Sequence, residues 1–305
     1  MTTLRLKIGP FVIALTGAAA PEENGNGSYS PFFYRGEEVS SLFIRIQDGL
    51  PPSLTKAPLV GGLLQNWRLF KEGEGWRFEL LDPANFQAKQ IARISPDFCS
   101  VDFYFCGEQG NLFSTRSWLL SQMTPFLQWW LTAYGAMRRT GFFVHASACA
   151  FPGRGGIVLS GPSGSGKTTL ALLCREHARA VLLNDERTLL WRDEGEFRVS
   201  GTPWPGKAQE VSPLSVPLAI LFLTTKAKQN RFVPVSTQEI LNRLIPELFL
   251  PSWNREAMAG LFEFCDRLIQ KVSVIEIHFK KDAGAVEMIK KITEFRSERR
   301  RLEAA

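Results

Sequence analysis

Hydrophobic and polar residues follow two different patterns along this chain. Up to about residue 124, short segments alternate between apolar and polar side chains, as in residues 42–46, 76–80 and 101–105, and turn residues separate them. An alternation with a period of two residues is typical of strands that bury one face. The pattern therefore predicts a mostly β N-terminal domain over residues 1–124, without indicating its role.

The second pattern covers residues 125–305. A helix is predicted over residues 125–139, where aromatic and other apolar residues recur at helical spacing. After it, apolar runs at residues 156–159, 180–183 and 218–223 have the length of buried strands, a helical pattern follows the first of them, and further helical patterns at 238–248 and 255–269 follow the third. Strands that alternate with helices are typical of an α/β domain, so we expect a second domain of this class joined to the first by the helix.

The most specific motif lies between the predicted strand 156–159 and the helix after it. Residues 161–168 read Gly-Pro-Ser-Gly-Ser-Gly-Lys-Thr and match every fixed position of the Walker A pattern. Glycines let backbone N–H groups surround phosphate oxygens, the lysine reaches the β- and γ-phosphates, and the following hydroxyl binds Mg²⁺. The motif predicts a site for a nucleotide with Mg²⁺; we expect ATP as the nucleotide, although the sequence leaves other phosphoryl donors open. The candidate nucleotide-binding residues are Gly161, Pro162, Ser163, Gly164, Ser165, Gly166, Lys167, Thr168 and Thr169, with Thr168 as a metal ligand.

A pair of carboxylates follows the next predicted strand. Asp185 and Glu186 come directly after the apolar residues 180–183 and Asn184. We expect this strand to lie in a parallel sheet beside the phosphate-binding loop. One carboxylate would then serve the Mg²⁺ while the other accepts a proton from an attacking hydroxyl. A solvated strand end is the alternative interpretation.

Two further features are candidates for the same site. His145 lies near the end of a strand just before the loop, and it is either a core histidine or a donor near the transferred phosphate. Residues 200–207 form a second loop rich in Gly and Pro, which is either a tight turn or a wall on the acceptor side. In the second case Lys207 would neutralise phosphate charge, and Arg187 is a further candidate on the substrate side.

The order of these motifs resembles a known family. Residues 145–147, the loop 161–168 and residues 184–187, followed by a Gly-rich loop, look like the catalytic domain of HPr kinase/phosphorylase and its relatives. That family shares its nucleotide-binding fold with phosphoenolpyruvate carboxykinase. The resemblance implies an α/β P-loop domain of this type, with Lys167 as the phosphate clamp. It also makes Asp185 the base on the acceptor hydroxyl, Glu186 a metal partner and His145 an active-site contact.

The chain departs from this family at two places. Asp185 and Glu186 stand where the family has paired aspartates, and residues 202–206 lack the family's Gly-Leu-Gly signature. The chain therefore looks like a member of the divergent HPr-kinase-related group. Assembly into homo-oligomers is suggested by the resemblance alone.

Composition narrows the class of protein only slightly. The chain has 305 residues, of which 45% are hydrophobic, and a net charge of +6. These values are ordinary for a soluble globular protein. Basic residues gather only in residues 280–301, where we expect a solvated helix face rather than a nucleic-acid site. No stretch is long and apolar enough to predict a membrane partner.

Cysteine usage bears on the compartment. The five cysteines show no Cys-x-x-Cys spacing, so neither a disulfide framework nor a zinc site is predicted, and a reducing cytoplasm is expected. The first residues loosely resemble a signal peptide. Pro10 interrupts their short apolar run, however, and the alternation in residues 4–8 predicts a strand instead.

Two functional hypotheses follow from these features. The first is an enzyme, a Mg-ATP-dependent kinase that transfers a phosphoryl group to a serine-type hydroxyl of a protein, peptide or small metabolite. The alternative is a nucleotide-responsive regulatory protein without turnover, in which the aromatic-rich β region binds a partner. The sequence leaves the identity of the acceptor open.

Overall fold

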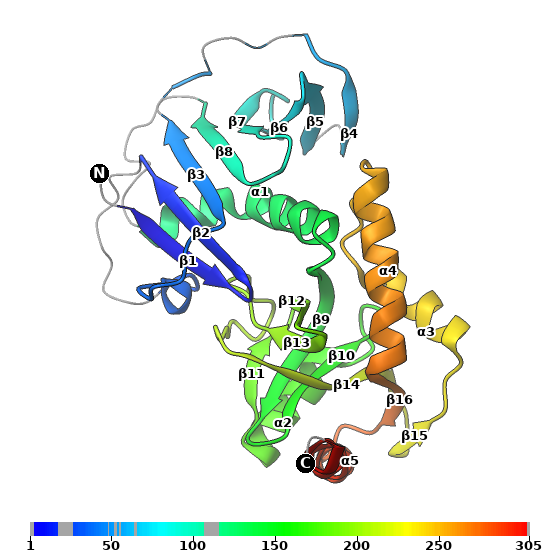
Figure 1. The fold of residues 1–305 in the computed structure, drawn as a ribbon. Coiled ribbons are helices and arrows are strands. Elements are labelled where there is room, and N and C mark those ends of the chain that lie inside the picture. Colours follow the sequence, from blue (N-terminus) through cyan, green and yellow to red (C-terminus); the bar gives the residue numbers. More distant parts are fainter. Residues whose placement is uncertain are drawn as a thin grey trace. The chain divides into compact units, whose positions relative to one another are not determined.

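The structure is a computed structural model, and it divides the chain into two units (Figure 1). It describes residues 3–17, 27–47, 49–51, 54, 56–63, 66–106 and 116–303, with the backbone alone for residue 63 and residues 296–303. The first unit comprises residues 1–134 and 252–255, and the second comprises residues 135–251 and 256–305. The division between the units thus falls inside a helix, after Tyr134, rather than after residue 124.

The first unit is built on an eight-stranded sheet with the order β1-β2-β3-β8-β7-β6-β5-β4. Strand β3 pairs in parallel with β2 and with β8, and the other neighbours pair antiparallel. Its elements are β1 (Leu4–Ile8), β2 (Phe11–Thr16), the single-turn helix η1 (Ser30–Phe32), β3 (Leu42–Gln47), β4 (Leu59–Leu63), β5 (Trp67–Glu72), β6 (Gly75–Leu81), β7 (Ala88–Ile94), β8 (Ser100–Phe105) and the helix α1 (Arg116–Met137).

One face of this sheet is buried and the other is open. In β3, Leu42, Ile44 and Ile46 are buried, whereas Phe43 and Arg45 point to the open face. Helix α1 covers the buried face, where the rings of Phe103 and Phe126 lie 5.2 Å apart. The alternation read from the sequence is therefore the alternation of a strand with one buried face.

Helix α1 differs from the prediction at its N-terminal end. The predicted helix starts at Pro125, but α1 starts at Arg116 and carries Pro125 in its interior. The expected start was wrong because proline is most at home in the first turn of a helix. Inside α1 its cost is offset by burial of the surrounding face, with Met123, Phe126 and Trp130 fully buried.

The second unit contains a mixed sheet and five helical elements that follow α1. The main strand order is β10-β9-β12-β13-β14-β16-β15, with β11 paired to β9 and an additional pairing between β10 and β14. Its elements are β9 (Gly141–Phe151), β10 (Gly155–Ser160), α2 (Lys167–Ala178), β11 (Val181–Asn184), β12 (Arg187–Asp193), β13 (Glu196–Ser200), β14 (Ser215–Lys226), β15 (Arg231–Val233), α3 (Thr237–Leu244), the single-turn helix η2 (Ile245–Glu247), α4 (Arg255–Lys271), β16 (Ser273–Phe279) and α5 (Ala283–Glu303).

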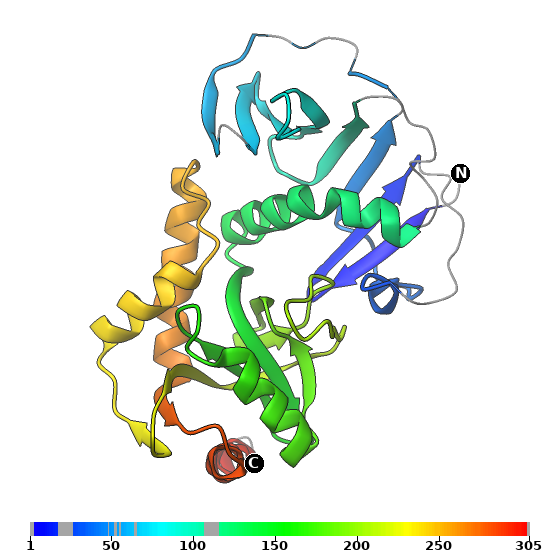
Figure 2. The same ribbon diagram turned by 180° about the vertical axis from the view of Figure 1, so that it is seen from behind.

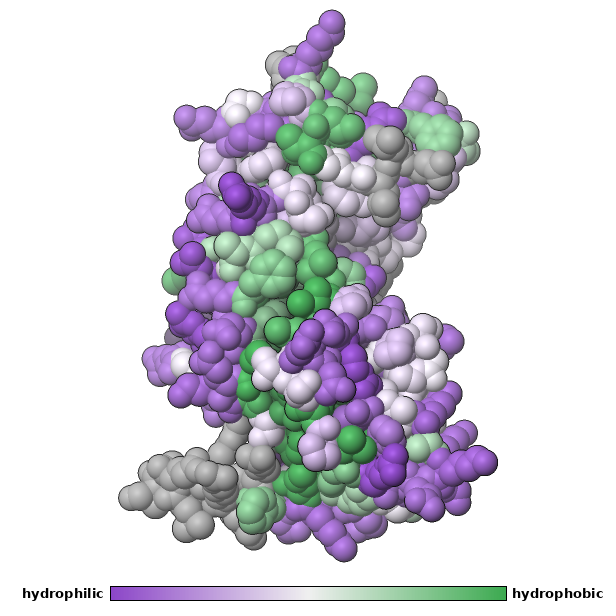
Figure 3. All heavy atoms as spheres, turned by 90° about the vertical axis from the view of Figure 1, so that its right-hand side faces the viewer, coloured by the Kyte–Doolittle hydropathy of each residue, from purple (hydrophilic) through white to green (hydrophobic). Residues whose placement is uncertain are grey.

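Helices cover both faces of this sheet. Ile157 and Leu159 of β10 belong to a core that includes side chains of α2 and α5, whereas Val158 belongs to a second core that includes side chains of α3 and α4. Figure 2 shows α2 in front of the strands, and Figure 3 looks onto the side that carries α3 and α4, where hydrophilic residues cover much of the surface. A strand buried on both faces has a continuous apolar run, which explains residues 156–159.

The pairing of β11 corrects one step of the sequence reasoning. We expected β11 to lie in a parallel sheet beside the phosphate-binding strand, but β11 pairs antiparallel with β9, and so does β10. Two strands that are both antiparallel to β9 run in the same direction. Their carboxyl ends therefore meet at the same edge, since Ser160 lies opposite Ala146 and Asn184 opposite Ala148.

Candidate functional site

The loop between β10 and α2 has a backbone that only glycine adopts without strain at several positions. The φ angles are +147° at Gly161, +83° at Gly164 and +98° at Gly166, all in the left-handed region. A Cβ at Gly166 would also lie 2.5 Å from Cζ of Phe279, so no side chain fits there. These residues shape the loop as the Walker A pattern requires.

The first turn of α2 faces this loop with open N–H groups. Gly166 is the N-cap of α2, and among the described residues no side chain accepts a hydrogen bond as its cap. The first turn carries no acidic residue either. Thr168 and Thr169 lie in this turn, both half-buried. Unsatisfied N–H groups together with the positive end of the helix dipole form a site for an anion such as phosphate.

Lys167 is the most enclosed cation of the site, with a side chain only 7% exposed. Its Nζ donates hydrogen bonds to the carbonyl oxygens of Gly161, at 2.5 Å, and Pro162, at 3.4 Å. Burial lowers the pKa of Lys167, while the negative charges of Glu247 and Glu186 oppose that shift. The ammonium thus lies folded over the loop, where it can turn to bound phosphates.

Contacts from β14 hold the loop in place. Oγ of Ser165 and Oγ1 of Thr224 lie 2.9 Å apart, and the Thr224 hydroxyl donates to the carbonyl of Ser160 at 3.1 Å. Arg243 of α3 donates to the carbonyl of Thr224 at 3.2 Å and forms an ion pair of 2.7 Å with Glu276. This network joins the start of the loop to the ends of two neighbouring strands.

Asp185 does not face the phosphate-binding loop with a free carboxylate. Its Oδ1 accepts the N–H of Gly206 at 2.8 Å and its Oδ2 accepts the N–H of Ala208 at 2.9 Å, and the residue is 2% exposed. Both oxygens are therefore engaged in holding the second Gly-rich loop. In the structure Asp185 is thus an anchor of that loop.

Asn184, the residue before Asp185, holds the same loop through its side-chain amide. Its Nδ2 donates to the carbonyls of Thr202 and Trp204, both at 3.0 Å, and its Oδ1 accepts the N–H groups of Glu186 and Arg187, both at 2.7 Å. The amide thus fixes the turn that carries Glu186. Sequence reasoning had treated Asn184 only as part of a motif.

Glu186 and His145 meet beside Lys167. Oε2 of Glu186 lies 3.5 Å from Nε2 of His145, and the Glu186 side chain is 42% exposed. His145 lies directly opposite Arg187 in the pairing of β9 with β12, which brings the turn at Glu186 next to it. Of the predicted carboxylates, Glu186 is therefore the one that opens toward solvent and toward the loop's lysine.

The two residues predicted on the substrate side, Arg187 and Lys207, differ in their environment: one is partly enclosed against an aromatic ring and the other is exposed. The guanidinium of Arg187 stacks 3.7 Å over the ring centroid of Phe249, and burial lowers its pKa against the opposing charge of Glu186. Lys207 is exposed on the second loop, and within the described residues no ion pair joins it to the site.

One site residue was missed by sequence reasoning. Glu247, the last residue of η2, places Oε2 3.0 Å from Nδ1 of His145 and 4.0 Å from Nζ of Lys167. No motif surrounds it in the sequence. Only the pairing of its neighbours with β9 brings it to the loop, so no local signal could have revealed it.

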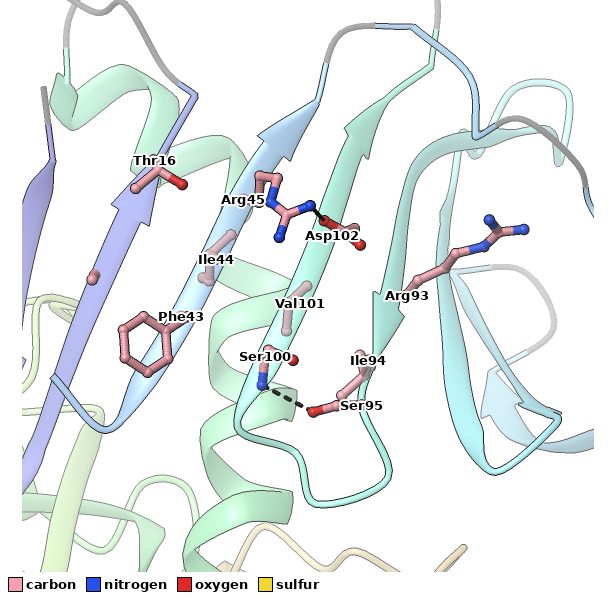
Figure 4. Close-up of a pocket in the computed structure, with 11 residues that line it drawn as sticks. Thr16, Phe43, Ile44, Arg45, Arg93, Ile94, Ser95, Ser100, Val101 and Asp102 are labelled. Atoms are coloured by element: carbon pink, nitrogen blue, oxygen red, sulfur yellow. Dashed lines mark hydrogen bonds and ion pairs between the residues drawn. The ribbon is translucent and has the colours of Figure 1, made fainter. Parts of the chain in front are cut away.

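A separate pocket of about 560 Å³ lies in the first unit (Figure 4). It occupies the open face of the sheet over β2, β3, β8 and β7, where Phe43, Arg45, Arg93 and Asp102 line it. An ion pair of 3.5 Å joins Arg45 and Asp102. This pocket carries both charged and aromatic side chains, but none of the predicted site residues.

Comparisons with known proteins add no assignment. No model of a known protein family matches the sequence, and a search of curated proteins finds no match. In the described part of the chain, no group of three or more His, Cys, Asp and Glu side chains is arranged to hold a metal ion. No helix among the described residues is long and apolar enough to cross a membrane.

Proposed function

We propose that the second unit is a Mg-ATP-dependent kinase of the HPr-kinase-related type, which transfers a phosphoryl group to a serine-type hydroxyl. One observation carries the proposal. Beside a Walker A loop with the required backbone geometry, the lysine, a half-exposed carboxylate and a histidine gather from three separate segments. Phosphoryl transfer needs little else from a protein than positioning and charge stabilisation at such a place.

The residues present fit a nucleotide with Mg²⁺. The glycine backbone and the open first turn of α2 suit phosphate oxygens, and Lys167 would bind the β- and γ-phosphates. The Thr168 hydroxyl would hold Mg²⁺ together with the nucleotide, since magnesium sites commonly combine one or two protein ligands with phosphate oxygens. The bound metal would neutralise phosphate charge.

The residue roles that we propose differ from those that the family resemblance implies. Asp185 has both carboxylate oxygens on backbone N–H groups, so it positions the second loop. We assign the role of base on the acceptor hydroxyl to Glu186, whose carboxylate is accessible and 3.5 Å from His145. His145 contacts the transferred phosphate in this proposal, and the expected role of Glu186 as a metal partner is given up.

Labelled ATP and a panel of serine-containing peptides and small alcohols test the proposal. We expect wild-type protein to label at least one acceptor, and Lys167→Ala to bind nucleotide more weakly and to lose transfer. Lys280→Ala is a matched control, because it removes an exposed lysine on another strand end. A wild-type protein that binds ATP and labels no acceptor of any class would overturn the kinase assignment.

A nucleotide-responsive regulatory protein is the second candidate, and the pocket of the first unit favours it. A protein of that kind binds nucleotide and a partner ligand without turnover. Measured phosphoryl transfer to one acceptor decides between the two.

Location and assembly stay proposals as well. Cys149, Cys174 and Cys265 are buried thiols, which fits a reducing compartment such as the cytoplasm. Homo-oligomers are proposed on the family resemblance only, and sedimentation of the purified protein tests them.

A further inference from the structure

Glu247 is a largely enclosed carboxylate beside the phosphate-binding loop. Its side chain is 10% exposed and contacts two cationic or potentially cationic groups, Nδ1 of His145 at 3.0 Å and Nζ of Lys167 at 4.0 Å. A carboxylate is rarely buried to this extent without a partner, because desolvation of its charge is costly. The two partners of Glu247, His145 and Lys167, therefore compensate the cost of enclosing its charge.

The backbone holds this carboxylate where it is. Leu248 forms a β-bridge with Val144, and the N–H of Phe249 donates to the carbonyl of Phe143 at 3.2 Å. Both bonds attach the segment after η2 to β9, the strand that carries His145. Main-chain pairing thus fixes the backbone at Glu247 beside the strand that carries His145.

The lysine is shared between this carboxylate and the loop itself. Lys167 donates to the carbonyls of Gly161 and Pro162 while its Nζ lies 4.0 Å from Glu247. Phosphate oxygens would compete for the same ammonium. A fixed negative charge at this distance from the lysine also repels an incoming polyphosphate, and in a partly buried site such repulsion is screened far less than in water.

We propose that Glu247 is the internal counter-charge of the phosphate-binding loop. It pairs with Lys167 while no nucleotide is bound, gives the lysine up to the phosphates on binding, and so holds nucleotide affinity below the value the loop alone would reach. Glu247 is a positioning residue in this sense, since it acts on the ligand through Lys167. The inference rests on the nucleotide site of the proposed function and not on the acceptor.

Titration of ATP and ADP by calorimetry tests the inference. Replacing the charge by a neutral amide of the same shape in Glu247→Gln should tighten the binding of both nucleotides about tenfold, because Lys167 then no longer has a competing counter-charge and is available to the phosphates. A merely structural role predicts the opposite sign, weaker binding. Glu263→Gln removes a carboxylate that pairs with Arg139 and Arg267 outside the site, and it should leave affinity unchanged.

A double-mutant cycle with Lys167→Met shows whether the effect passes through the lysine. The gain from Glu247→Gln should shrink to less than threefold in that background. Unchanged or weaker nucleotide binding by a Glu247→Gln variant that melts like the wild type overturns the inference.

The outcomes for this inference and for the kinase proposal are distinguishable. If Glu247→Gln binds nucleotide more tightly and the wild type transfers phosphate to no acceptor, the counter-charge inference is supported and the kinase proposal is overturned. If the wild type transfers phosphate and Glu247→Gln shows no gain in nucleotide affinity, the kinase proposal is supported and the counter-charge inference is overturned. If neither the wild type nor Glu247→Gln binds nucleotide, the counter-charge inference and the kinase proposal are both overturned.

Discussion

Neighbouring carboxylates Asp185 and Glu186 should show opposite responses to neutralisation. Asp185 accepts two backbone N–H groups, of Gly206 at 2.8 Å and Ala208 at 2.9 Å, in a 2% exposed position. Hydrogen bonds to a charged group are worth about 1.5–3 kcal/mol each. In Asp185→Asn the amide oxygen can keep one of them, while the amide NH₂ would face the other N–H.

The expected loss of stability for Asp185→Asn is therefore about 2 kcal/mol, one charged hydrogen bond. For a unit of this size that loss lowers the melting temperature by about 4–8 °C. Glu186→Gln changes a side chain that is 42% exposed, so its stability should stay within about 0.5 kcal/mol of the wild type. Its transfer rate should fall by about 10²–10⁴, the usual contribution of a general base.

Urea unfolding and labelled-ATP transfer, measured on the same preparations, check both variants. Transfer by Asp185→Asn should be assayed well below its melting temperature, so that loss of structure does not count as loss of chemistry. An Asp185→Asn variant with wild-type stability and no transfer would refute the reasoning, because it would return the role of base to Asp185. Full transfer by Glu186→Gln would refute the other half.

Three further outcomes are expected. Gly166→Ala should weaken nucleotide binding more than tenfold, because the added Cβ would lie 2.5 Å from Cζ of Phe279 and the φ of +98° is unfavourable for alanine. Gly164→Ala should weaken binding less in the same titration, because its φ of +83° is unfavourable but its Cβ meets open space. Equal effects of the two variants would contradict this reasoning. Burial raises the pKa of Cys174 to about 12, so iodoacetamide at pH 8 should modify this thiol only after unfolding, as peptide mass spectrometry can show. Burial opposes ionisation of Glu276, but the hydrogen bonds from Arg243, Thr225 and His278 and the charge of Arg243 together outweigh burial and lower the pKa of Glu276 below its usual value of 4.5. The resulting stabilisation is present above pH 4.5 and is lost as the pH falls further. Glu276→Gln should therefore flatten the acid-unfolding profile in that range, and an unchanged profile would speak against this reasoning.

Local patterns predicted most of the elements of the fold. The alternation in residues 42–46 became β3 and the apolar run at 156–159 became β10, because burial on one face or on both faces leaves a direct signature in the sequence. The start of α1 was missed. The sequence signal at Pro125 favours a helix start there, and the cost of this proline inside a helix is overcome only by packing that the sequence does not display.

The candidate site divides in the same way. The Walker A loop could be read from the sequence because its chemistry depends on consecutive residues and on glycine backbone angles. Asp185 and Glu186 could not be told apart in that manner. They are neighbours in the chain, but which of them faces the second loop and which faces His145 depends on the turn that Asn184 holds.

The sequence by itself determined the strand-loop-helix unit, its glycines and its lysine, since all of these interact within a short stretch of chain. Only the tertiary structure decided which carboxylates join them. Glu247 reaches Lys167 because the segment after η2 pairs with β9. The carboxylate of Asp185 is instead hydrogen-bonded by the N–H groups of Gly206 and Ala208, which are distant in the sequence. Pairing between segments far apart in the chain leaves no periodic trace in either one, so its consequences become visible only when the strands are placed side by side.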